Sequence, residues 1–432
     1  MVSILIKRKS ERKMGRVKEG TAAILNLVSA SILIGMTLLC FFLWTRGIGT
    51  PEMFNIYAHM SRYMPLGATI VLVLNCYRMK WADMIWVGVA LLSILFFHQF
   101  DTMRQADFFL DITIALIIFV VLDFKLVEFT KELRLIFAGL MLIILLITAY
   151  RIFSEIPTPT SGNSIWDKSN KLQEIWINTN TIGSSVMCSS FLIATLLQSL
   201  DWTWAKILKF VVYFIALACT WVVQSQAAFF AVVCFVLFDA WPNFLKEKVR
   251  WAYGVVYSVF LIGIFPLSLY LANSSNIDLF TGREDIWKQF YDTLFKVRKQ
   301  FLVGMPPFTF KRGEQILGNH NSYNAILGGF GLIGLVLISL FILYNIWSLI
   351  IREETQAIQF SFIIAFFAIL LQSTMEDTLM APYWIPITFC LLGLAWQENP
   401  EIKEFYDYST NVFDQRDEEL EIEPSRKNRR RL

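Results

Sequence analysis

The sequence predicts an all-α polytopic integral membrane protein with about twelve transmembrane helices and a large helical extracytoplasmic loop. Hydrophobic residues make up 56% of the 432 residues, and charged residues only 17%, against about 25% in soluble domains. The mean hydropathy is +0.53. Several apolar runs reach the roughly 20 residues that a helix needs to cross the hydrocarbon core of a bilayer. The lipid bilayer is therefore the first expected partner, and no nucleic-acid partner is expected.

The chain is expected to divide into a basic N-terminus at 1–21, a membrane domain at 22–397 and a charged tail at 398–432. The tail alternates acids and bases, has few apolar residues and is expected to be largely disordered. The first apolar run is too long for the core of a signal peptide, so it is expected to remain as a span. The twelve expected spans lie near 22–44, 54–75, 83–99, 106–123, 135–152, 182–200, 206–224, 226–240, 251–272, 321–349, 357–373 and 379–397.

Basic residues predict the orientation, because they gather before the first span and in alternate connections. These residues are Lys7, Arg8, Lys9, Arg12, Lys13, Arg16 and Lys18, then Arg78, Lys80, Lys125, Lys131, Arg134, Lys206, Lys246, Lys248, Arg250 and Arg352. Short cytoplasmic connections carry an excess of Lys and Arg. Both termini are therefore expected in the cytoplasm, in a cytoplasmic (plasma or inner) membrane.

Two long segments are expected on the extracytoplasmic side, at 153–181 and 273–320. The second contains seven basic residues, which goes against the charge bias of that side, although long loops cross a membrane regardless of charge. Five acidic residues accompany the seven bases, so an ordinary solvated surface is one interpretation. The other is a site for an anionic substrate carried by the membrane.

The stretch "TGREDIWKQFYDTLF" lies in the second long segment and predicts an amphipathic helix. Thr281 and Glu284 have the spacing of a capping box. The apolar residues of its expected face, which suits the membrane interface, are Ile286, Phe290, Leu294 and Val297. Arg283 lies in the first turn, where a cation opposes the helix dipole. A phosphate bound there would contact both the free backbone N–H groups and the guanidinium.

The stretch "GNHNSYNAILGGFGLIG" brings His320 to the start of the tenth expected span. Gly328, Gly331 and Gly334 predict a bare helix face for close packing. The polar residues before it, Asn321, Tyr323 and Asn324, are candidates to orient His320 or to bind sugar hydroxyls. Histidine can be neutral near pH 7 and accept a proton. The other two histidines, His59 and His98, lie within apolar spans and are expected to be structural.

Together, "TGREDIW" and "HNSYNAILGGFGLIG", in this order and in a protein of about twelve spans, resemble the O-antigen ligase and O-antigen polymerase family. "INTNTIGSSVM" also resembles the Asn-rich start of a middle span in that family, which makes Asn178 and Asn180 candidate site residues. The resemblance implies a glycosyltransferase architecture of the GT-C type. It also implies a glycan donor carried on undecaprenyl diphosphate, a glycan acceptor, inversion at the anomeric carbon, and no metal or other cofactor.

The resemblance implies that His320 is the general base and that Arg283 holds the diphosphate. Such roles agree with general acid–base and electrostatic catalysis. The sequence differs from the family at one position: Gln226 stands where an arginine usually follows a serine, in "VVQSQAAFF". Arg62, within the second expected span, and Arg151, at the end of the fifth, are candidates to supply the missing contact. No Asp/His cluster that could bind a metal is evident in the extracytoplasmic segments.

Three functions remain open from the sequence. The leading one is a polymerase that joins lipid-linked oligosaccharide repeats into O-antigen, capsule or exopolysaccharide, with a chain-length regulator as a further expected partner. A ligase that transfers the glycan to another acceptor would use the same donor chemistry. A transporter or flippase of lipid-linked sugars belongs to a different class, and it favours broken helices and internal repeats, neither of which the sequence shows.

Overall fold

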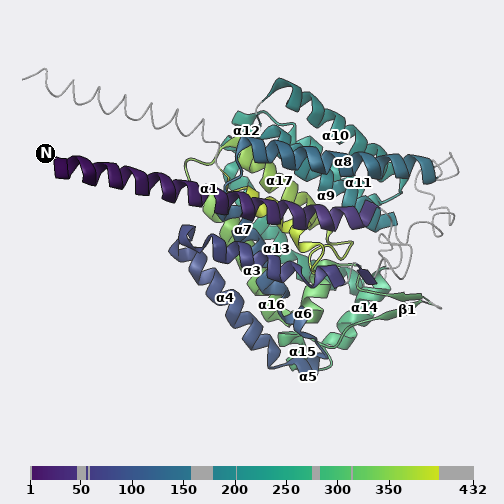
Figure 1. Cartoon of the computed structure of the whole chain (residues 1–432). Helices are drawn as coiled ribbons and strands as arrows, with labels where there is room; N and C mark the ends of the chain where they lie inside the picture. Colours follow the sequence, from purple (N-terminus) through teal and green to yellow (C-terminus); the bar gives the residue numbers. More distant parts are fainter. Residues whose placement is uncertain are drawn as a thin grey trace, which may run out of the picture. The chain divides into compact units, whose positions relative to one another are not determined.

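The structure is a computed structural model that describes residues 2–45, 55–56, 59–156, 179–200, 202–274, 283–312 and 315–397. The described residues up to Ala395 form one compact unit, which is mostly helical (Figure 1). The charged tail at 398–432 and most of the predicted segment 153–181 lie outside the described residues.

Seven of the described helices are long and apolar enough to cross a membrane. They are α1 (Val2–Thr45), α4 (Trp81–His98), α8 (Lys131–Glu155), α9 (Thr179–Gln198), α10 (Thr203–Val222), α13 (Arg250–Asn273) and α16 (Ser322–Ile351). In α1 the apolar part is Gly20–Phe42, and the helix begins at Val2 rather than near 22. These helices confirm a multi-pass helical membrane protein.

Each of the five remaining predicted spans contains a shorter helix. They are α3 (Met64–Leu74), α7 (Thr113–Leu126), α11 (Gln226–Asp239), α17 (Ala357–Gln372) and α18 (Ile385–Leu394). The longest of the five, α17, has 16 residues, and at about 1.5 Å per residue it is shorter than a hydrocarbon core of about 30 Å. The number of twelve spans therefore stays a prediction.

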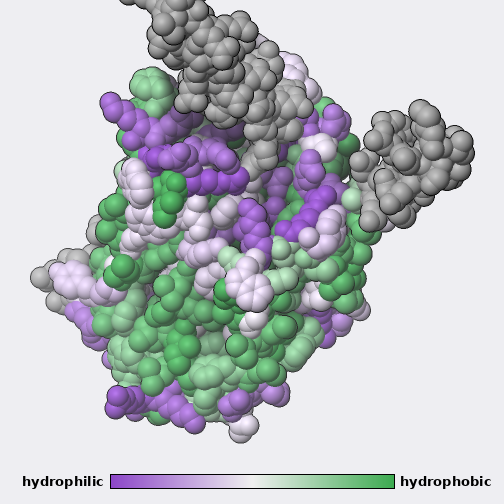
Figure 2. All heavy atoms as spheres, turned by 90° about the vertical axis from the view of Figure 1, so that its left-hand side faces the viewer, coloured by the Kyte–Doolittle hydropathy of each residue, from purple (hydrophilic) through white to green (hydrophobic). Residues whose placement is uncertain are grey.

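Three of these short helices, α7, α17 and α18, lie inside the bundle, where nearly all of their side chains are buried. Gly393 of α18 allows a close approach to α7, because a Cβ atom there would lie 2.5 Å from Phe124 Cβ and 2.7 Å from the Val121 carbonyl oxygen. The longer helices expose apolar side chains instead, such as Leu91, Leu92 and Leu95 of α4. Figure 2 shows a broad hydrophobic area with hydrophilic residues along its upper and lower edges, as expected for a surface that contacts lipid.

The other elements are short. They are η1 (Cys76–Arg78), α5 (Asp101–Arg104), α6 (Phe108–Asp111), α12 (Asn243–Lys248), α14 (Arg283–Leu294), α15 (Arg298–Val303), β1 (Phe310–Arg312) and β2 (Gln315–Leu317). Strands β1 and β2 are antiparallel, with Phe310 opposite Leu317. The predicted all-α class agrees with the mostly helical structure, to which the segment 273–320 adds one small hairpin.

Helix α16 is interrupted at Gly331, whose φ of 62° and ψ of −167° are not helical. The sequence predicts an unbroken helix here, and that prediction is wrong. The predicted close packing of the glycines is confirmed at Gly328, where a Cβ atom would lie 3.2 Å from the Phe290 ring of α14. At Gly331 itself, a Cβ atom would lie 2.3 Å from the backbone of Leu302 in α15. The α15 backbone thus approaches α16 where α16 breaks.

Candidate functional site

Arg283 and His320 lie on either side of one carboxylate, that of Glu376, in the segment between α17 and α18. Arg283 Nη2 donates a hydrogen bond to Glu376 Oε1 at 2.7 Å. His320 Nδ1 lies 3.9 Å from Glu376 Oε2. Arg283 and His320 remain partly exposed, at 17% and 23% of their side chains, whereas Glu376 is exposed by only 8%. The two residues that the sequence singled out are therefore brought together, and an acidic residue joins them.

Arg283 is placed by the packing of α14, of which it is the first residue. The apolar face is confirmed for Ile286, Phe290 and Leu294, which are buried. That face packs against protein rather than lying at the membrane interface, because Phe290 meets α16 at Gly328. Trp287 Nε1 also donates a hydrogen bond to the carbonyl oxygen of Asn319, at 3.0 Å, and so fixes α14 to the residue before His320.

Two residues of the predicted helix do not lie in α14 as the structure describes it. Val297 follows the end of α14 and its side chain is exposed. Thr281, the proposed capping residue, lies outside the described residues.

His320 is placed by the start of α16. Its φ of 46° is in the left-handed region, which is uncommon for residues other than glycine and often marks a functional site. The next residue, Asn321, is the N-cap, and its Oδ1 accepts hydrogen bonds from the backbone N–H groups of Tyr323 and Asn324 at 2.9 and 3.1 Å. The turn at His320 thus directs the imidazole away from the helix axis and toward Glu376.

Ser322 fixes the Glu376 segment to the start of α16. Its hydroxyl donates to the carbonyl oxygen of Glu376 at 2.7 Å. Ser322 Oγ in turn accepts hydrogen bonds from the backbone N–H groups of Thr378 and Leu379 at 2.9 and 3.2 Å. Because Ser322 is fully buried, no solvent competes for these hydrogen bonds. One side chain therefore holds both ends of the short acidic segment.

Asp377 is a second acidic group at the site. Burial raises its pKa from 3.8 to about 6, and the negative charge of Glu376 adds to this effect. The electrostatic interaction with His320 and a backbone hydrogen bond from Asn321 lower the pKa of Asp377 in part. The N–H group of Asn321 donates to Asp377 Oδ1 at 3.1 Å. The carboxyl group of Asp377 therefore keeps its proton to a higher pH than an ordinary aspartic acid.

Sequence reasoning missed Glu376 and Asp377. The signal was present in "STMEDTLM", which places two neighbouring acids just before the last apolar run. Ionisable residues at the edge of a span are expensive to bury and are candidates for function. Their partners, however, lie in segments more than 50 residues away, which only the fold reveals.

The polar residues that follow His320 are buried, with 1% of Asn321, 3% of Tyr323 and 1% of Asn324 exposed. Tyr323 donates its hydroxyl proton to the carbonyl oxygen of Leu370 at 2.9 Å. Asn324 Oδ1 accepts from the hydroxyl of Tyr291 at 2.7 Å. These side chains stabilise the site, and their contact with sugar hydroxyls stays a prediction.

The turn between α10 and α11 lies beside the start of α9. A Cβ atom at Gly183 would lie 2.3 Å from Ser225 Cβ. The next residue of α9, Ser184, accepts a hydrogen bond from Gln372 Nε2 at 2.7 Å, and Gln372 Oε1 accepts from Thr378 at 3.1 Å. A chain of hydrogen bonds thus runs from Ser184, beside this turn, through Gln372 to Thr378 in the segment that follows Glu376.

Gln226 itself is exposed at the start of α11, after the buried Gln224 and Ser225. The structure describes Asn180 as half-buried, with its carbonyl oxygen accepting from Ser184 at 2.8 Å. Asn178 lies outside the described residues. The roles of these residues in substrate binding stay predictions.

The two arginines proposed to replace the missing family arginine have other partners in the structure. The guanidinium of Arg62 lies 5.1 Å from the centre of the Phe109 ring. Arg151 forms two hydrogen bonds with Glu155, at 2.8 and 3.0 Å, one turn along the same helix. A role for either one in diphosphate binding stays a prediction.

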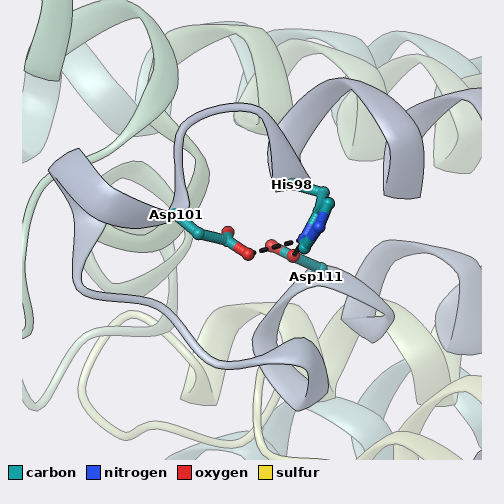
Figure 3. Close-up of side chains that lie close together, drawn as sticks. All are labelled: His98, Asp101 and Asp111. Atoms are coloured by element: carbon teal, nitrogen blue, oxygen red, sulfur yellow. Dashed lines mark hydrogen bonds and ion pairs between the residues drawn. The ribbon is translucent and has the colours of Figure 1, made fainter.

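A second cluster lies where α4 ends and α5 and α6 follow. Figure 3 shows the side chains of His98, Asp101 and Asp111 pointing toward one another. His98 Nδ1 lies 2.7 Å from Asp101 Oδ2 and 3.4 Å from Asp111 Oδ2. The three donor atoms lie within 4.8 Å of one another, so they could hold a metal ion. Sequence reasoning found no evident Asp/His cluster of this kind and missed this one, whose members are brought together by the fold.

The neighbouring Arg104 gives this cluster a different interpretation. Its Nη1 lies 2.9 Å from Asp111 Oδ1 and 3.7 Å from Asp101 Oδ1. The guanidinium of Arg104 and, when it is protonated, the imidazole of His98 would balance the two carboxylates without a bound cation. A histidine that pairs with two acids is also consistent with its predicted structural role.

The fold and its surface define the class of protein as a multi-pass helical membrane protein. Comparisons with protein-family models, curated proteins and solved structures find no match. The function must therefore be inferred from the residues at the site.

Proposed function

We propose that this protein is a glycosyltransferase that takes glycan from a polyprenyl-diphosphate-linked donor, and that it joins lipid-linked oligosaccharide repeats as a polysaccharide polymerase. The observation that carries this proposal is the convergence of Arg283 and His320 on Glu376. A cation for a diphosphate and a base for a hydroxyl are the two groups that such a transfer needs. We propose further that the twelve predicted spans have a GT-C-like arrangement, with both termini cytoplasmic and the site on the extracytoplasmic side of the cytoplasmic membrane.

In the proposed reaction, a hydroxyl of the acceptor attacks the anomeric carbon of the donor sugar. The new C–O bond forms as the bond to the diphosphate oxygen breaks, and His320 accepts the hydroxyl proton. Polyprenyl diphosphate leaves with the bonding electrons, and the nearby Arg283 stabilises the charge that builds on it. The roles of His320 and Arg283 come from the resemblance, and their geometry is compatible with them.

Glu376 has a role in this proposal that the sequence did not suggest. Its carboxylate lies 3.9 Å from His320 Nδ1, so it stabilises the imidazolium that forms when His320 accepts a proton. It also pairs with Arg283. A guanidinium has five N–H donors, so it can bind a phosphate as well as a carboxylate. The donor diphosphate would then compete with Glu376 for Arg283.

The test of the base uses purified full-length protein in lipid vesicles with one defined undecaprenyl-diphosphate-linked repeat. We expect His320→Ala to slow transfer by roughly 10²- to 10⁴-fold, because a positioned base contributes about that much. His59→Gln is the matched control, since His59 is exposed and bonds to Asn55 within its own segment. Transfer by His320→Ala at the rate of the control would remove His320 as the base.

The test of the cation compares Arg283→Ala with Arg283→Lys in the same assay. We expect the alanine variant to lose donor use more severely than the lysine variant, because lysine keeps the charge but not the paired N–H geometry. Wild-type kinetics for both variants would exclude the proposed role. A ladder of products from wild-type protein identifies a polymerase, whereas a single addition that requires a second acceptor identifies the alternative, a ligase.

One observation favours a second candidate, a transporter of lipid-linked sugars. Transporters often place their substrate at interrupted helices, and α16 is interrupted at Gly331. Movement of a fluorescent lipid-linked sugar across vesicles that contain the protein, without formation of a glycosidic bond, would support the transporter and contradict the transferase.

A further inference from the structure

The interruption at Gly331 divides α16 into two helical parts, 322–330 and 332–351. The first part is short, and His320 and its N-cap Asn321 come directly before it. Because a short helix moves as one rigid piece, the direction of its axis determines where the His320 imidazole lies. The contacts at the far end of 322–330 therefore bear on the geometry at Glu376.

That far end is held by two donors from outside the helix. The backbone N–H of Met305 donates to the carbonyl oxygen of Gly328 at 2.7 Å. Arg104 Nε donates to the carbonyl oxygen of Gly329 at 2.9 Å. The last carbonyl groups of a helix lack partners within it, and a positive charge there also interacts favourably with the helix dipole. Arg104 thus caps the C-terminal end of the part that carries His320.

Arg104 is itself fixed on several sides and is fully buried. Its guanidinium lies 5.2 Å from the centres of both the Phe97 and Phe330 rings. Its Nη1 donates to the carbonyl oxygen of Phe97 at 3.0 Å and to Asp111 Oδ1 at 2.9 Å. The other oxygen of Asp111 faces His98 in the cluster of Figure 3.

Burying an ion pair costs free energy, because both charges lose their hydration. Apolar residues of similar volume often stabilise a fold equally well or better. Arg104 is needed here for a more specific reason: among its contacts, the hydrogen bond to Gly329 joins two segments that are 225 residues apart. The cluster of His98, Asp101 and Asp111 then acts as the anchor of this arginine.

We propose that Arg104 is a positioning residue, which fixes the helical part 322–330 and thereby holds His320 against Glu376. Asp111 fixes the guanidinium, His98 contacts Asp111, and Asp101 holds His98. This inference rests on the proposed function for the role of His320, whereas the capping of 322–330 does not depend on it.

The experiment has two readouts on the full-length protein in detergent or vesicles. Hydrogen–deuterium exchange of 322–330 measures the cap without any substrate, and glycan transfer measures the consequence for the reaction. For Arg104→Gln we expect exchange of 322–330 to rise by about tenfold or more, because a charge-assisted hydrogen bond is lost, while 332–351 keeps its protection. We expect kcat to fall by roughly 10- to 100-fold with an unchanged KM for the donor, because His320 is misplaced while Arg283 is intact.

Arg104→Lys keeps the charge and should recover most of the protection and part of kcat. Arg352→Gln is the matched control, because Arg352 follows the opposite end of α16, and it should change neither readout. If Arg104→Gln fails to fold, Asp111→Asn tests the same anchor with a smaller change and should raise exchange of 322–330 selectively.

Unchanged hydrogen–deuterium exchange of 322–330 in Arg104→Gln would contradict the proposed capping by Arg104. An increase that is equally large over 332–351 would contradict it as well. A rise of exchange confined to 322–330 together with an unchanged kcat would show that Arg104 caps the helix but does not position His320. A wild-type protein that transfers no glycan would defeat the proposed function instead, and the exchange data would still decide whether Arg104 caps the helix.

Discussion

Replacing Gly331 by alanine tests the interrupted helix most directly. The added Cβ atom would lie 2.3 Å from the Leu302 carbonyl carbon and 2.4 Å from both the Leu302 oxygen and the Val303 nitrogen. Unstrained contacts of a carbon atom are about 3.5–4.0 Å, so the α15 backbone would have to move away by more than 1 Å. In addition, φ of 62° with ψ of −167° belongs to a region that only glycine enters readily.

Both effects raise the free energy of the folded state. Backbone strain of this kind costs roughly 1–3 kcal/mol, and overpacking costs roughly another 1–3 kcal/mol, so we expect a loss of about 2–6 kcal/mol. The measurement is the free energy of unfolding of the purified protein in detergent, followed by loss of tertiary structure. Gly263→Ala in α13 is the matched control, since nothing lies within 4 Å of its Cβ position and alanine favours a helix.

We expect the control to be neutral or slightly stabilising, by less than about 1 kcal/mol. Equal stability of Gly331→Ala and the control would refute the reasoning, because α16 would then be an ordinary continuous helix at this position. The close approach of α15 to α16 would be refuted by the same result.

Two further predictions concern the acidic segment. The raised pKa of Asp377, about 6 against 3.8, means that the folded state binds more protons than the unfolded state between about pH 4 and pH 6. The free energy of unfolding should therefore fall by at most about 3 kcal/mol as pH rises through that window. Asp377→Asn should remove this pH dependence in unfolding experiments. An unchanged pH dependence in the variant would show that Asp377 is not its source. Ser322→Ala leaves the buried N–H groups of Thr378 and Leu379 without their acceptor, so we expect a loss of at least about 2 kcal/mol in the same unfolding measurement, and no measurable loss would show that Ser322 does not hold the segment.

The sequence was a sound guide wherever the signal was local. Long apolar runs identify the seven long helices, and the spacing of Ile286, Phe290 and Leu294 identifies the buried face of α14. The same spacing cannot tell whether that face meets lipid or protein, because both are apolar environments. The close packing at Gly328 was predicted, but its partner Phe290 was not, since it belongs to another helix.

Other features depend on partners that are distant in the chain. The carboxylate between Arg283 and His320 is 93 residues from Arg283, and Arg104 is 225 residues from the carbonyl group that it caps. No pattern within a single helix encodes such pairs. The break at Gly331 escaped prediction for a related reason: glycine tolerates both a helical and a non-helical conformation, and the approach of α15 decides between them.

The pairing of Arg283 with Glu376 has a consequence for biogenesis. Membrane proteins are inserted from the N-terminus during synthesis, so the arginine emerges from the ribosome well before the glutamate, with α16 and α17 still to be made. Until α17 has been made, the nascent chain lacks Glu376 and Asp377 altogether. Arg283, His320 and both acids are therefore present together only near the end of synthesis, so, on the proposed function, an unfinished chain would not act on its lipid-linked donor.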